Sequence, residues 1–276
     1  MNPALSDPAW REREYSPSSA IGGNYAPHIA RYVQDSATAR ESIPLQADRR
    51  YGDAPRALID FFPAPKQQSV TGLLVFIHGG YWQELSKNES CFLAPAWHEA
   101  GFAHAVIGYT LAPSATLPQI VDECVAALNW LKAQATSLGF DQDRIVVAGS
   151  SAGAYLAAAC ATRVSLKGIV PISGIFDVAP LIGTSINVAL RLNPVNAAAL
   201  NLMTTTSQLA PSVVAYGEIE TSEFKRQSRS FAALLNERGV NCECFEIPQR
   251  NHFDVVHELS DNGTRLFAAT FQLFNR

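Results

Sequence analysis

The chain has 276 residues, and 47% of them are hydrophobic, which is enough for one large α/β domain with a sizeable core. Its net charge of -4 and its lack of clustered lysine and arginine argue against nucleic acid as a partner. The N-terminus is polar and no hydrophobic run reaches the ~18 residues that a membrane span needs, so we expect a cytoplasmic protein with no membrane partner.

The five cysteines indicate neither a metal site nor a disulfide framework. Their number is odd, most lie in hydrophobic stretches, and none shows the two-residue spacing of metal or redox motifs. Cys242 and Cys244 alternate along an expected strand and therefore share one of its faces. We expect reduced, buried thiols, no metal and no other cofactor.

The N-terminal part precedes the regular pattern of the chain. Residues 1–43 are polar and turn-rich with one short amphipathic stretch, so we expect them to wrap the surface or to contribute to a lid. Residues 44–65 contain two short β-rich runs around Gly52, Asp53 and Pro55, which predicts an antiparallel hairpin at the start of the sheet.

From residue 72 onward, short hydrophobic runs alternate with helical patterns. The clearest helices are residues 117–133, where hydrophobic residues recur at helical spacing, and 222–239, which ends at Gly239 as a C-terminal cap would. This alternation predicts a single α/β domain over residues 1–276, with a mostly parallel central sheet and helices on both faces. The expected strands cover residues 72–80, 102–111, 143–150, 167–174, 212–218 and 242–248.

Residues 177–209 interrupt this alternation without a strand of their own. They follow the carboxyl end of an expected strand, where α/β enzymes place lids and pocket walls. We therefore expect a small lid-like insertion.

The stretch VVAGSSAGAYLAAA places Ser151 between Gly149 and Gly153. A serine hydroxyl attacks a carbonyl only where a base and oxyanion donors reach it. Here an expected strand runs into a tight turn and then a helix of small residues, and the glycines let strand and helix approach closely. Ser151 is therefore the candidate nucleophile, and Ser150 completes the turn.

The sequence HGGYW, residues 78–82, lies at the end of the expected strand at residues 72–80. The consecutive amides of Gly79 and Gly80 can turn toward one point, and the amide of Ala152 follows the candidate nucleophile. We expect these three N–H groups to form an oxyanion hole.

A base and an acid are predicted near the C-terminus. His252, in NHF after the last expected strand, is the histidine placed to serve as the base. Glu220 is the preferred acid because it lies in the loop beyond a strand end, with Glu218 and Asp177 as alternatives. Glu223 is expected to begin the next helix as a first-turn carboxylate.

These motifs resemble the α/β-hydrolase superfamily across nearly the whole chain. HGGYW, YGDAPRALIDFF, SGIFDVAPL, GEIETSEFKRQS and NHF resemble more narrowly the kynurenine formamidase (arylformamidase) family and its bacterial esterase relatives. The resemblance implies a triad of Ser151, Glu220 and His252, with oxyanion donors from Gly79 and Gly80. The chain departs from the family in its glutamate, where animal members usually have aspartate, and in the NLMTTTSQL end of the lid segment.

We expect a serine hydrolase that cleaves a small aryl amide or ester through an acyl-enzyme, with N-formylkynurenine as the leading substrate. Tyr81 and Trp82, beside the oxyanion hole, are expected to stack on an aromatic leaving group, with a packing role as the alternative. The alternative functions are a carboxylesterase for short-chain acyl esters, an acyltransferase, and a non-catalytic ligand-binding protein of the same fold. The expected partner is a small-molecule substrate, and the sequence leaves a homo-oligomer open.

Overall fold

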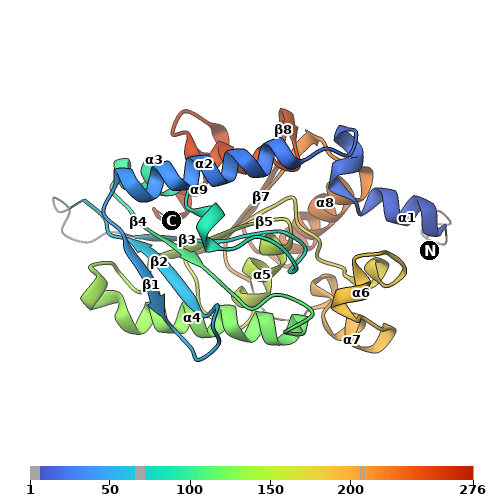
Figure 1. Ribbon diagram of the computed structural model, residues 1–276, viewed down its shortest axis with the longest axis horizontal. Helices are drawn as coiled ribbons and strands as arrows, with labels where there is room; N and C mark the ends of the chain where they lie inside the picture. The colour runs from blue at the N-terminus through green and yellow to red at the C-terminus, as the bar shows by residue number, and fades with distance from the viewer. Residues whose placement is uncertain (1–6, 66–71, 206, 208, 276) are drawn as a thin grey trace.

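The computed structural model describes residues 7–65, 72–205, 207 and 209–275, which fold around one eight-stranded sheet (Figure 1). The strand order is β1-β2-β4-β3-β5-β6-β7-β8. β2 pairs antiparallel with β1 and β4, and the other neighbours are parallel. The predicted mostly parallel sheet is therefore confirmed. The strands are β1 (Gln46–Arg50), β2 (Leu58–Phe62), β3 (Leu73–Ile77), β4 (Ala103–Ile107), β5 (Ile145–Ser150), β6 (Gly168–Ile172), β7 (Ser212–Ile219) and β8 (Cys242–Asn251).

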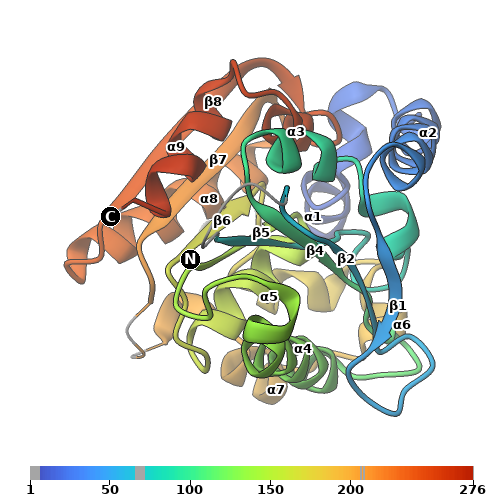
Figure 2. The same cartoon turned by 90° about the vertical axis from the view of Figure 1, so that its left-hand side faces the viewer.

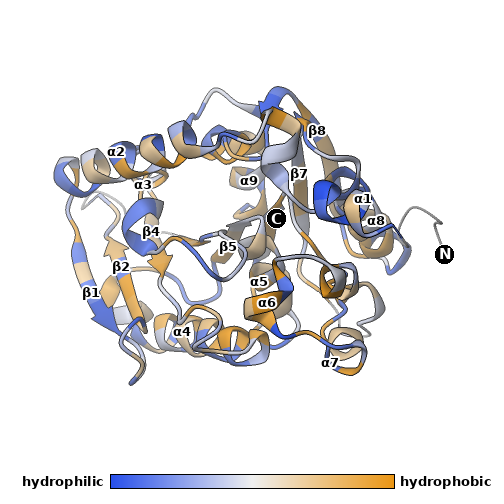
Figure 3. Ribbon diagram, turned by 45° about the vertical axis from the view of Figure 1, so that its right-hand side comes forward, coloured by the Kyte–Doolittle hydropathy of each residue, from blue (hydrophilic) through white to orange (hydrophobic). Residues whose placement is uncertain are grey.

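The strands arise where the sequence predicts them. β1 and β2 form the predicted hairpin, and each of the six later hydrophobic runs coincides with one strand, although β7 and β8 extend beyond the predicted ends at residues 218 and 248. β3, β4, β5 and β6 are buried along their whole length, as expected for strands covered on both faces. β1, at one edge, is largely hydrophilic, whereas its neighbour β2 is largely hydrophobic (Figure 3).

Helices cover both faces of the sheet (Figure 2). The two helices predicted from periodicity are α4 and α8, and each is followed by a glycine with positive φ, Gly139 at 80° and Gly239 at 74°. The helices are α1 (Pro8–Glu14), α2 (Ala26–Ser42), α3 (Ala94–Glu99), α4 (Leu117–Leu138), α5 (Ala152–Ala161), α6 (Asn187–Leu190), α7 (Pro194–Ala199), α8 (Ser222–Glu237) and α9 (Arg265–Leu273).

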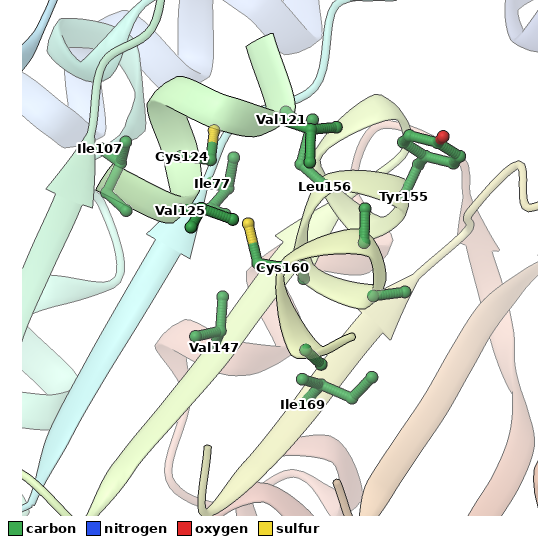
Figure 4. Close-up of a cluster of buried hydrophobic side chains, with 14 of the residues drawn as sticks. Ile77, Ile107, Val121, Cys124, Val125, Val147, Tyr155, Leu156, Cys160 and Ile169 are labelled. Atoms are coloured by element: carbon green, nitrogen blue, oxygen red, sulfur yellow. The ribbon is translucent and has the colours of Figure 1, made fainter. Parts of the chain in front are cut away.

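Each face of the sheet has its own hydrophobic core. α4, α5 and α8 pack on one face, and α2, α3 and α9 pack on the other. On the first face, Cys124 of α4 and Cys160 of α5 lie among branched aliphatic side chains from the strands, including Ile77 and Val147 (Figure 4). The small residues of α5 let this helix lie directly on the middle of the sheet.

Ion pairs around a buried aspartate link α2 to the sheet. Asp60 of β2 is fully buried and accepts hydrogen bonds from Arg40 of α2 and from Lys87 of the 3₁₀ helix η3 (Lys87–Ser90). The Lys87 Nζ to Asp60 Oδ1 distance is 2.9 Å. A buried carboxylate needs such partners, so α2 and η3 are held in fixed positions at this edge of the sheet.

Two segments lie outside the regular layers. The described residues of 1–43 form α1, the 3₁₀ helix η2 (Pro17–Ile21) and α2. The described part of 177–209 contains the 3₁₀ helices η4 (Ala179–Gly183) and η5 (Leu202–Thr204) with α6 and α7, and no strand. Residues 1–6, 206 and 208, also covered by these two predictions, lie outside the described residues. In the part of the chain that the structure describes, no helix is long and hydrophobic enough to cross a membrane.

Candidate active site

Ser151 lies on a strained turn between β5 and α5. Its φ of 57° and ψ of −118° are unusual for a residue with a side chain and cost energy that the surrounding packing must offset. A Cβ atom at Gly149 would lie 2.1 Å from the carbonyl oxygen of Gly153, and one at Gly153 would lie 2.0 Å from that of Ile77. Only glycine fits at these two positions, so the spacing of the motif follows from the geometry of the turn.

His252 and Glu220 form a buried pair beside this turn. His252 Nδ1 lies 3.0 Å from Glu220 Oε2, and the edge of the imidazole packs on the ring of Phe224 at a centroid distance of 4.4 Å. Because Nδ1 is engaged by the carboxylate, Nε2 is the ring nitrogen left to act as a base. His252 and Ser151 line the same cavity.

The other carboxylates considered from the sequence lie elsewhere. Glu218 is exposed and accepts a hydrogen bond from the backbone N–H of Gln249. Asp177 accepts the N–H of Ala179 at the start of η4. Glu223 lies in the first turn of α8, as expected, and is hydrogen-bonded to Arg226 and Tyr15. None of these three carboxylates is hydrogen-bonded to His252 among the described contacts, whereas Glu220 is.

Sequence reasoning missed Ser173. Its buried hydroxyl donates to Glu220 Oε1 at 2.6 Å, and the backbone N–H of Gly217 donates to the same oxygen. Ser173 directly follows β6, the strand that lies between β5 and β7. A polar residue at the carboxyl end of a central strand was the one sequence signal that could have found it.

The expected oxyanion residues lie next to Ser151. Gly79 and Gly80 line the cavity, and a Cβ atom at Gly79 would lie 2.8 Å from the carbonyl oxygen of Ser150. Gly80 has a φ of 88°. Ala152 is the first residue of α5, where backbone N–H groups have no intrahelical partner and the helix dipole favours negative charge. The arrangement is suited to stabilising an oxyanion.

His78 holds the loop that carries these glycines. Its ring stacks on Tyr109 at a centroid distance of 4.2 Å, and the Tyr109 hydroxyl donates to the His78 carbonyl at 2.9 Å. Burial lowers the pKa of His78 to about 4, so the imidazole is neutral at neutral pH. His78 therefore adds no positive charge to the site.

Tyr81 and Trp82 occupy different environments. Tyr81 lines the cavity, and its hydroxyl donates to the Tyr15 carbonyl. Trp82 has an exposed fraction of 0%, packs edge-on against Tyr155 and is not among the residues lining the cavity. The expectation that Trp82 stacks on a substrate is therefore corrected: it is a packing residue of the core.

The cavity beside Ser151 has a volume of about 210 Å³. Aromatic rings form much of its wall: Tyr25 stacks on Phe253 at 5.2 Å, and Tyr32 stacks on Phe92 at 5.0 Å. The N-terminal segment and the segment at 177–209 both reach this cavity, the latter through Ile186.

The N-terminal segment is also bound to the loop that carries Glu220. The Thr221 hydroxyl donates to the carbonyl of Glu14, and the Tyr15 hydroxyl donates to Glu223 at 2.8 Å. Residues 16–18 then continue along the cavity. Within the described ranges, no group of three or more histidine, cysteine, aspartate or glutamate side chains is arranged to hold a metal ion.

Comparisons with known proteins find hydrolases among the chains that this one resembles. Residues 59–182 match the BD-FAE family model. The chain is 26% identical to the kynurenine formamidase of Danio rerio over 90% of its own length and 88% of the relative's. It is 29% identical to that of Drosophila melanogaster, with 81% and 80% covered.

Solved structures give the same fold. A provisionally assigned thioesterase from Silicibacter sp. superposes with a TM-score of 0.84 at 26% identity, covering 94% of this chain and 98% of that one. An esterase from Pyrobaculum calidifontis superposes with a TM-score of 0.74 at 19% identity, covering 98% of each chain. The chain therefore has the α/β-hydrolase fold, and it is similar in sequence to kynurenine formamidases and in structure to esterases.

Proposed function

We propose that the chain is a serine hydrolase that cleaves a small aryl amide or ester, with N-formylkynurenine as the leading substrate. One observation carries the proposal: the buried His252–Glu220 pair lies at a cavity that also opens onto Ser151. A histidine oriented by a carboxylate beside a serine on a strained turn is the arrangement that activates a hydroxyl for acyl transfer.

In the proposed mechanism, Ser151 Oγ attacks the acyl carbon while His252 Nε2 takes its proton. Glu220 stabilises the imidazolium that forms, and the N–H groups of Ala152, Gly79 and Gly80 bind the oxyanion. The imidazolium then gives its proton to the leaving amine or alcohol, and an acyl-enzyme remains. Water, deprotonated by His252, attacks this ester, releases the acid and restores Ser151.

The aryl formamide is preferred for two reasons. Kynurenine formamidases are among the relatives that match over most of the chain, and the cavity wall is rich in aromatic rings that suit an aryl leaving group. The alternative is a carboxylesterase for short-chain acyl esters. It is favoured by the 31% identity, over 46% of this chain, to the carboxylesterase/phospholipase LipF of Mycobacterium tuberculosis.

A substrate panel tests the proposal and separates the two candidates. We expect the purified protein to hydrolyse N-formylkynurenine with a much higher kcat/KM than phenyl acetate or phenyl butyrate. Equal activity on all three compounds would instead support the carboxylesterase. Ser151→Ala should lower kcat by about 10⁴-fold or more on whichever compound is cleaved.

Covalent labelling with a fluorophosphonate tests the nucleophile independently of the substrate. Wild type and Ser150→Ala should be labelled, because both retain Ser151, whereas Ser151→Ala should not. A wild-type protein that resists labelling would contradict the serine mechanism and support a non-catalytic binding role.

A further inference from the structure

The described side chains that line the cavity include a carboxylate but no lysine or arginine. Among the described residues that line it, Glu84 is the only carboxylate, and there is no lysine or arginine. The two histidines at the cavity do not change this balance: His78 is buried and neutral, and His252 is paired with the carboxylate of Glu220. A ligand in this cavity therefore meets negative charge without a compensating cation.

Glu84 is held close to the expected oxyanion loop. Its backbone N–H donates to the carbonyl of Gly80 at 2.9 Å, and a Cβ atom at Gly80 would lie 3.2 Å from the Cβ of Glu84. The residue is exposed, and its side chain forms no ion pair with any residue that the structure describes. An exposed carboxylate without an ion-pair partner is free to pair with a cationic ligand.

The residues that line the cavity differ in polarity and exposure. Phe76, Phe92 and Val256 are buried and hydrophobic, whereas Gln83 and Glu84 are half-buried or exposed. An aromatic ring gains most by packing on the buried hydrophobic residues, which leaves its polar substituents toward the exposed ones. Those substituents then lie on the side of Glu84.

We propose that Glu84 makes this site select aryl substrates that carry a positive charge, such as an ammonium group, and reject those that carry a carboxylate at the same place. The inference rests on the proposed function, since it assigns a substrate class to the same site. For N-formylkynurenine it implies that the α-ammonium group, and not the α-carboxylate, lies toward Glu84.

A charge series of matched substrates tests the proposal. The compounds are formanilides with a meta aminomethyl, hydroxymethyl or carboxymethyl group, which differ mainly in charge. At low ionic strength we expect kcat/KM to be about three- to tenfold higher for the aminomethyl than for the hydroxymethyl compound, and lowest for the carboxymethyl compound. Glu84→Gln should bring the three values within about twofold of one another, and Glu84→Lys should reverse their order.

Glu237→Gln is the matched control, because Glu237 is an exposed glutamate of α8 that does not line the cavity and its replacement changes the net charge equally. It should keep the wild-type order. An order that Glu84→Gln leaves unchanged, or one that Glu237→Gln abolishes equally, would overturn the proposal.

The same series prepared as phenyl acetates separates this inference from the proposed function. If only the acetates are cleaved, the aryl formamide assignment fails, while the ratios among the acetates still decide the role of Glu84. If neither series is cleaved, NMR titration with benzylammonium and benzoate decides it without turnover. Benzylammonium should bind more tightly to wild type and lose this advantage in Glu84→Gln, whereas equal binding of the two ions would overturn the proposal.

Discussion

Glu220 uses both carboxylate oxygens, one for His252 and the other for Ser173 and Gly217. A glutamate has one more rotatable bond than an aspartate, so it loses more conformational freedom when it is fixed. Two donors on Oε1 hold the longer side chain in place. This arrangement gives a physical reason why glutamate can serve at this position.

Ser173→Ala tests whether Ser173 positions Glu220. The change removes one of the two donors to Oε1, so we expect kcat to fall by about tenfold with little change in KM, because Ser173 is not among the residues that line the cavity. Ser173 has a φ of 52°, which glycine adopts without strain. Ser173→Gly should therefore show the same loss of kcat as Ser173→Ala but a higher midpoint of urea unfolding. Wild-type kcat in both variants would contradict the positioning role.

The residues of the site differed in how far the sequence could predict them. Ser151, Glu220 and His252 could be selected because each follows a strand that its own hydrophobic pattern reveals. Trp82 could not be placed, because Gly80, Tyr81 and Trp82 all have positive φ and turn the indole into the core. No periodicity of the sequence indicates such a turn.

At the scale of elements, the close packing of α5 on β3 positions the candidate nucleophile. α5 approaches the carboxyl end of β3 at Gly153, where a side chain would meet the backbone carbonyls of Ile77 and His78. A backbone contact of this kind cannot be relieved by a change of rotamer. The turn at Ser151 therefore depends on the absence of a side chain two residues later.

Gly153→Ala should lower the free energy of unfolding by about 2 kcal/mol or more, because the new methyl group displaces α5 from β3. A decrease in the free energy of unfolding is informative, because alanine in place of glycine in an unobstructed helix would instead stabilise the helix by about 1 kcal/mol. Gly52→Ala is the control, because a Cβ atom there makes only an ordinary 3.4 Å contact with Ala57. Equal midpoints of urea unfolding for the two variants would contradict this account.

Local sequence patterns predicted only part of the role of the N-terminal segment. Its amphipathic stretch predicts a surface element, and α2 indeed covers one face of the sheet. Its contribution to the cavity depends on contacts between residues far apart in the chain, such as Tyr15 with Glu223, which are separated by 208 residues. The short helices between residues 177 and 205 escaped prediction because each has too few turns to show a period.

At the scale of the whole molecule, the alternation of hydrophobic runs and helical patterns predicted the sheet. The same pattern did not predict how many polar side chains the folded protein buries. His78, His104 and His257 are all buried, and burial lowers the pKa of these side chains from the ordinary value of 6.5 to about 4, about 3 and about 4. The folded protein therefore holds three histidines in their neutral form over a pH range where the unfolded chain would protonate them.

This difference predicts that stability falls on mild acidification. Below pH 6.5 the unfolded chain binds protons that the folded chain does not, so the free energy of unfolding decreases as pH falls from 6.5 toward the folded pKa values near 4. Each histidine should contribute a loss of about 1.5 kcal/mol between pH 6.5 and pH 5. Urea unfolding at several pH values in this range measures how steeply the free energy of unfolding falls with pH. His104→Leu or His257→Phe should each remove about one third of this fall. A midpoint that does not change with pH would show that these histidines are protonated in the folded state.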